Sequence, residues 1–238
     1  MPDTPNLALP LLSPSQAQKH VTVNEALGRL DAAVQLSVVS RTLTLPPAAA
    51  QDGDAYLVPT GAANAWAGQG GRIAVRQNGG WVFLTPRPGW RAFVAAESLH
   101  VLFDGIDWAE NTVAVAPGGS ALAFAVREFD HAVTAGATST TAAEIPGSAV
   151  VFGVTGRVLS DITGTLSAWR LGVAGSDDRY GTGLGSGEGA WVRGLTGSPL
   201  TYYAPTALLL TAEGGTFGGG GTVRFAVHYV TIGLPRPA

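Results

Sequence analysis

The apolar positions near the N-terminus repeat with the period of an α-helix. Four of them recur at spacings of four, three and four residues, which places them on one helical stripe: Val23, Leu27, Leu30 and Val34. We therefore predict a short amphipathic helix over about residues 24–40, with Arg29 and Asp31 on its polar side. The stripe packs either on its own domain or along a seam between chains, and it is too short to establish a coiled coil.

Two capping signals precede this predicted helix. Residues 22–25 read Thr-Val-Asn-Glu, a capping box in which the first and last side chains satisfy free backbone amides. Residues 13–16 read Ser-Pro-Ser-Gln, which offers an N-cap and a proline at the first helical position. This second signal predicts a shorter helical turn before the main helix, and we assign residues 1–45 to an N-terminal anchor and helix.

Short strand-like runs separated by turn signals replace the helical period over residues 46–128. Asn78-Gly79-Gly80 lies between "RIAVRQ" and "WVFL" and predicts a β-hairpin, because this turn chemistry matches the twist of paired strands. Tryptophans in so small a β unit are expected in its core or at a contact with a neighbour, rather than as sugar platforms. The four are Trp66, Trp81, Trp90 and Trp108. We predict a small tryptophan-rich β domain and linker here.

The last segment, residues 129–238, again reads as strands. "GTLSAWRLGV" and "TVRFAVHYVTI" alternate apolar and polar positions, and "SAVVFGVTG" is a continuous apolar run typical of a strand covered on both faces. The glycine-rich "EGGTFGGGG" predicts a hairpin loop between the last two strands. The fold class is therefore mainly β, with a C-terminal β-sandwich or jelly roll as its largest part.

Composition and charge exclude several classes of function. The chain has no cysteine, which removes disulfides, thiol nucleophiles and cysteine-based zinc sites. Its net charge of -3 comes without a basic cluster, so we expect no nucleic-acid partner. No apolar run reaches the roughly 18 residues of a membrane span. The first residues do not resemble a signal peptide, so we expect synthesis in the cytosol.

Motifs for catalysis are weak. The sequence contains neither a phosphate-binding G-x-x-x-x-G-K-[ST] loop nor a G-x-S-x-G nucleophile elbow, and its four histidines lack metal-ligand spacing. A glycoside hydrolase needs two facing carboxylates. The candidates are Asp177, Asp178, Glu188 and Glu213. Asp177 and Asp178 are also a candidate calcium pair, although their spacing is not that of an EF-hand loop. We expect no catalytic residues and no cofactor.

Binding chemistry gathers in the stretch of residues 168–194, "AWRLGVAGSDDRYGTGLGSGEGAWVRG". Sugar recognition uses flat aromatic faces together with planar polar groups. The aromatic candidates are Trp169, Tyr180 and Trp191, with Tyr202 and Tyr203 nearby; the polar candidates are Asp177, Asp178, Arg179 and Arg193. We predict an open, glycine-rich loop that carries these ligand-binding groups. The alternative places both tryptophans in the core and pairs Asp177 with Arg179.

One block of the sequence is similar to a known family. Residues 9–41, "LPLLSPSQAQKHVTVNEALGRLDAAVQLSVVSR", resemble the head-spike and fibre family of alphaproteobacterial gene transfer agents and related prophages. The resemblance continues through "DGDAYLV", "GGWVFLTPRPGW" and "LFDGIDW", which covers about the first 108 residues. In the C-terminal part, "DDRYGTGLG" and "LTGSPLTYYAPTALLLTA" resemble a longer member of that family.

The resemblance implies a component of the particle surface. It implies a trimeric spike that mounts on the particle through its N-terminal region, next to other spike or capsid subunits, and binds capsular polysaccharide of the recipient cell through its C-terminal β domain. The particle would be assembled in the producer cytoplasm and released by lysis. Two alternatives stay open at this stage: a glycan-cleaving depolymerase, and a structural connector that binds no glycan.

Overall fold

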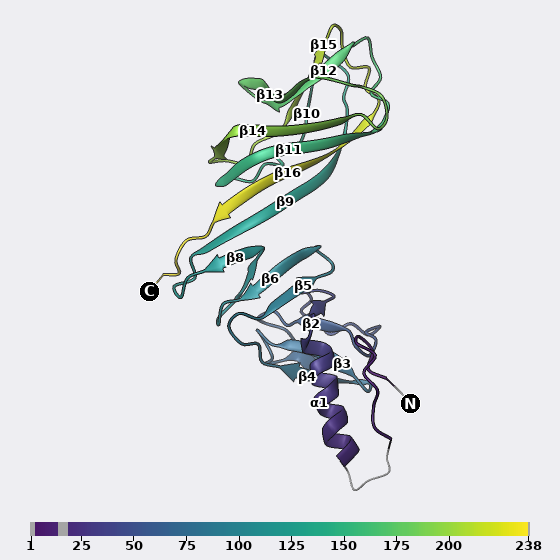
Figure 1. Cartoon of the computed structure of the whole chain (residues 1–238), viewed down its shortest axis with the longest axis vertical. Helices are drawn as coiled ribbons and strands as arrows, with labels where there is room; N and C mark the ends of the chain where they lie inside the picture. Colours follow the sequence, from purple (N-terminus) through teal and green to yellow (C-terminus); the bar gives the residue numbers. More distant parts are fainter. Residues whose placement is uncertain (1–2, 14–18, 238) are drawn as a thin grey trace. The chain divides into compact units, whose positions relative to one another are not determined.

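The computed structural model describes residues 3–13 and 19–237, and it divides into two compact units (Figure 1). The first unit ends at Pro117 and the second begins at Gly118. The first therefore contains both the N-terminal anchor and most of the predicted small β domain. The predicted boundary at residue 128 lies inside a strand, β9 (Ala121–Ala132).

The first unit has one α-helix among its described residues, α1 (Lys19–Ala33). It is shorter than the predicted helix, because the chain turns at Gln35, which has a positive φ, and continues as strand β1 (Ser37–Val38). The capping box of residues 22–25 lies inside α1, so it does not start the helix. The predicted shorter turn falls on residues 14–18, outside the described part of the chain.

The helix buries a face next to the predicted one, turned toward Asp31. Leu30 and Val34 are 52% and 46% exposed, whereas Asp31 and Ala32 are only 4% and 5% exposed. Asp31 can be buried because its carboxylate accepts hydrogen bonds from the backbone amides of Asn6 and Leu7, at 3.2 and 2.7 Å. The sequence places Asp31 on the polar side, but a turn of the N-terminal segment, over residues 5–7, supplies the partners that satisfy it. Within the described part of the chain, Val23, Leu30 and Val34 of the apolar stripe stay exposed, and Leu27 is half-buried.

Two small sheets make up the rest of the first unit (Figure 1). One has the order β1-β5-β6-β7, with β5 (Arg91–Val94), β6 (Leu99–Phe103) and β7 (Trp108–Glu110). The other has the order β2-β3-β4, with β2 (Ala55–Leu57), β3 (Ile73–Gln77) and β4 (Gly80–Leu84). A 3-10 turn, η1 (Asn64–Trp66), follows β2, and strand β8 (Thr112–Val115) precedes the end of the unit.

The sequence signals of this β region are confirmed. Gln77 pairs with Gly80, so Asn78 and Gly79 form the two-residue hairpin turn, both with positive φ. Trp66 is fully buried, with its ring centroid 5.3 Å from that of Tyr56 and 5.1 Å from that of Trp81. The other three tryptophans are partly buried against the cores of the unit. These rings therefore hold the unit together, as predicted.

The second unit is built from two antiparallel sheets (Figure 1). In the larger sheet the strands of this unit have the order β14-β11-β16-β9, where β11 is Ala149–Ser160, β14 is Trp191–Tyr202 and β16 is Thr222–Ile232. The smaller has the order β10-β15-β12-β13, with β10 (Thr138–Thr140), β12 (Ala168–Val173), β13 (Ser176–Leu184) and β15 (Leu209–Glu213). The prediction of a mainly β chain with a C-terminal sheet assembly is confirmed.

One apolar core joins the two sheets of this unit. Phe225 and Val154 come from the larger sheet, and Leu171 and Leu210 from the smaller; each is fully buried. Because β15 and β16 belong to different sheets, the glycine-rich segment between them is a crossover and not the predicted hairpin loop. This crossover lets consecutive strands cover the same core from opposite sides.

Candidate functional site

The stretch of residues 168–194 is not the open loop that its glycine content suggested. It forms β12, β13 and the start of β14. Glycine is required where backbones approach closely: a Cβ at Gly172 would collide with the backbone of Ser176 and Asp177, and one at Gly194 with the backbone of Tyr180. The glycines therefore tighten the contact between strands.

Three of the aromatic candidates lie in the core. Trp169 is 1% exposed and donates from Nε1 to the carbonyl of Gly185 at 2.9 Å. Tyr180 and Tyr202 are also buried, and their hydroxyls lie 2.8 Å apart. Burial and this hydrogen bond raise the pKa of Tyr180 far above its usual range, so the phenol stays protonated. None of the three rings presents a face to solvent, which corrects their prediction as sugar platforms.

The other candidates stay at the surface, in different places. Asp177 forms an ion pair with Arg170 at 2.9 Å, and not with Arg179. Asp178 on β13 is exposed, and Tyr203 just after β14 is 87% exposed. Trp191 and Arg193, both exposed on β14, lie together. The Arg193 guanidinium lies over the Trp191 ring, 5.7 Å from its centroid.

Trp191 and Arg193 belong to a regular grid on the outer face of the larger sheet. Directly paired residues share a face of a sheet, so the strand register defines the rows of this grid. One row runs across four strands through Trp191, Arg157, Arg224 and Asp130. The next row runs through Arg193, Thr155, Ala226 and Glu128. The alternate row, which includes Val192 and Phe225, faces the core.

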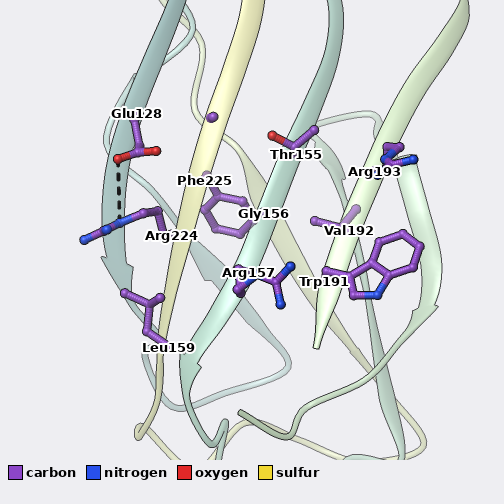
Figure 2. Close-up of a pocket in the computed structure, with 11 residues that line it drawn as sticks. Glu128, Thr155, Gly156, Arg157, Leu159, Trp191, Val192, Arg193, Arg224 and Phe225 are labelled. Carbon is purple, nitrogen blue, oxygen red and sulfur yellow. Dashed lines mark ion pairs between the residues drawn. The ribbon is translucent and has the colours of Figure 1, made fainter. Parts of the chain in front are cut away.

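A hollow of about 400 Å³ lies on this grid (Figure 2). The surface is hollowed here because the two middle positions of the second row, Thr155 and Ala226, carry small side chains. Longer side chains surround them, as Figure 2 shows: Trp191 and Arg193 from β14, Arg157 from β11, Arg224 from β16 and Glu128 from β9. We call this feature the outer hollow and define it by these seven residues.

Charge is distributed unevenly around the outer hollow. Arg224 binds both carboxylate oxygens of Asp130, at 2.6 and 2.8 Å, and lies 3.8 Å from Glu128. This contact holds the pKa of Asp130 below its usual range. On the other side, Arg157 donates to the carbonyl of Gly189 at 3.0 Å, and Arg193 lies over Trp191. The β9–β16 side therefore carries one net negative charge, from two carboxylates and one guanidinium, and the β11–β14 side carries the two positive charges of Arg157 and Arg193.

This arrangement provides the elements of a carbohydrate site. A 62% exposed indole offers a flat apolar face, and the guanidinium groups beside it offer hydrogen bonds. The sequence identified Trp191 and Arg193 but missed Arg157, Arg224, Thr155, Ala226 and Glu128. These five residues lie on three other strands, and only the register of the sheet brings them together.

Comparisons with known proteins found similarities over parts of the chain. Residues 23–109 match the family described as "Protein of unknown function (DUF2793)". No curated protein matches the chain. Among solved structures, the chain is similar to a chain of the "Cyanophage Pam1 capsid asymmetric unit", with 24% identity and a TM-score of 0.29, over 47% of this chain and 84% of that one. None of the helices formed by the described residues is long and apolar enough to cross a membrane.

Proposed function

We propose that this protein is a surface spike of a phage-like particle that binds capsular polysaccharide of the recipient cell through its C-terminal unit. The N-terminal resemblance to head spikes and fibres supports the particle surface as its place, with assembly in the producer cytoplasm and release by lysis. The outer hollow, with its exposed indole beside guanidinium groups, is the observation that carries the glycan-binding role.

Binding without cleavage suits the outer hollow better than hydrolysis. Of the described residues that line it, only Glu128 carries a carboxylate, whereas glycoside hydrolysis uses two facing ones. Single sugar sites on an open surface bind weakly. Several copies on one particle strengthen attachment, because each later engagement is intramolecular. The lining of the outer hollow therefore supports an adhesive role over that of a depolymerase.

This role can be tested by a substitution that fills the outer hollow and leaves the buried core unchanged. We expect Ala226→Phe to reduce binding of the full-length protein to purified recipient capsule about tenfold, because the new ring occupies the space left for a sugar. Binding would be measured by biolayer interferometry on immobilised capsule. Phenylalanine is a good strand residue, so the melting temperature should stay nearly constant.

Thr201→Phe is the matched control for this experiment. Thr201 pairs with Val150, on the same outer face as Ala226 but outside the outer hollow. The control adds a similar bulk to the same sheet and should bind capsule like the natural chain. Equal binding by Ala226→Phe, or equal loss in both variants, would contradict a glycan site at the outer hollow.

The uncovered stripe of α1 supports assembly of the spike into a homotrimer, seated next to other spike or capsid subunits. Leu30 also lines an apolar hollow of about 700 Å³, together with Ala26, Ala33, Phe83 and Trp90. Apolar surface of this kind is costly to leave in water, and partner subunits would cover it.

We expect Leu30→Glu to lower the molar mass in solution from that of a trimer to that of a monomer, because the seam would then bury a charge. Multi-angle light scattering after gel filtration measures this change. Glu25→Gln, on an exposed part of the same helix, should leave the mass unchanged. A natural chain that is monomeric at micromolar concentration would refute the seam.

A further inference from the structure

We infer that the outer hollow selects acidic polysaccharides, in which sugar rings carry carboxylate groups at low density. This inference rests on the proposed function and names the class of glycan that the same site would take. It comes from the arginines of the outer hollow, which the sequence analysis assigned only in part.

Arg157 and Arg193 are available to an anion. Neither forms an ion pair with any carboxylate that the structure describes, in contrast to Arg224. Arg157 uses one Nη for the carbonyl of Gly189, and Arg193 offers its planar face to the indole. Each guanidinium therefore retains N–H donors, and guanidinium–carboxylate contacts are frequently bidentate.

The register places both arginines beside the aromatic platform. Arg157 is the direct cross-strand neighbour of Trp191, and Arg193 is two residues further along the same strand, on the same face. Figure 2 shows both side chains next to the indole. A sugar ring bound at Trp191 would therefore lie close to both guanidinium groups. A carboxylate attached to that ring would lie within reach of one of them.

The total charge favours a glycan with few negative groups. Arg157, Arg193 and Arg224 face the two carboxylates of Glu128 and Asp130, which leaves one net positive charge on the grid. One surplus charge matches one carboxylate per bound sugar segment. A densely sulfated or phosphorylated polymer would instead meet repulsion from Glu128 and Asp130 on the β9–β16 side.

The experiment compares uronate polymers with their own neutral forms. Full-length protein would be titrated against polygalacturonate, alginate and hyaluronan, and against the same polymers after carboxyl reduction. We expect at least one charged polymer to bind about tenfold more tightly than its reduced form, with binding that weakens as salt rises. The double variant Arg157→Gln/Arg193→Gln should remove this preference, so that it binds the charged and the reduced form of a polymer equally.

Arg76→Gln is the matched control, because Arg76 lies over Trp81 in the first unit, 5.4 Å from the ring centroid. It should keep the preference for carboxylate. Equal binding of charged and reduced polymers would overturn the inference, as would stronger binding of dextran sulfate than of every uronate polymer. If Ala226→Phe lowers capsule binding while the carboxylate preference is absent, only the inference fails. If capsule binding ignores both Ala226→Phe and the double variant, the proposed function fails as well.

Discussion

Trp191→Ala is expected to weaken glycan binding more than any other single change in the outer hollow. The indole is the only aromatic ring among the residues that define the outer hollow, and its removal takes away the face on which a sugar would stack. Tryptophan truncation at a binding centre typically costs at least about 2 kcal/mol, or roughly thirtyfold in Kd. The loss of affinity is larger for a polymer that several subunits bind together, because the contact of each subunit is weakened.

Calorimetric titration with capsule oligosaccharide measures the single-site effect of Trp191→Ala, and adsorption to encapsulated cells measures the compounded one. The melting temperature should barely change, since the side chain is largely in solvent. Tyr203→Ala is a suitable control, because Tyr203 is even more exposed but lies outside the outer hollow. A variant that binds as tightly as the natural chain would exclude Trp191 as the platform.

Trp169→Ala is expected to have the opposite profile, with a large loss of stability. Trp169 is 1% exposed, and its ring packs edge-on against Phe225 of the other sheet, with centroids 6.4 Å apart. Truncating a buried tryptophan leaves a cavity and typically costs about 3–5 kcal/mol. The unfolding transition of the second unit should therefore move to lower temperature and lower denaturant concentration.

Scanning calorimetry, together with urea unfolding followed by fluorescence, measures this loss. Trp169→Phe should be milder, because it keeps an aromatic ring in the core and loses mainly the hydrogen bond to Gly185. Unchanged stability in Trp169→Ala would mean that the ring does not occupy the core. The two variants would thus separate the stabilising role of Trp169 from the proposed binding role of Trp191.

Some local signals in this sequence were confirmed, whereas the capping box of residues 22–25 and the glycine-rich hairpin were wrong. The Asn78-Gly79 turn could be predicted because its geometry depends only on the residues that form it. The alternating runs of the second unit likewise predicted strands. The face that the helix buries could not be predicted in this way. Asp31 is buried by backbone amides of a segment 24 and 25 positions earlier, and residue spacing on the helix carries no information about them.

The candidate site likewise contains residues that could be predicted from the sequence and residues that could not. Glycine density alone indicated a loose loop, although Gly172 and Gly194 serve close strand contacts that only the folded chain reveals. Trp191 and Arg193 were accessible to sequence reasoning because they are two residues apart on one strand. Their partners Arg157 and Thr155 are more than 30 positions away, so a single sequence gave no means of joining them.

The depth of the outer hollow depends on Thr155 and Ala226, which point away from the core. Substitutions at these two positions can reshape the surface while the buried layer beneath, with Val192 and Phe225, stays intact. If capsule binds at the outer hollow, single substitutions at these two positions would change which recipient cells are bound, with little effect on the free energy of folding. Related particles would then differ first at these two positions, whereas the buried Trp169 would stay unchanged.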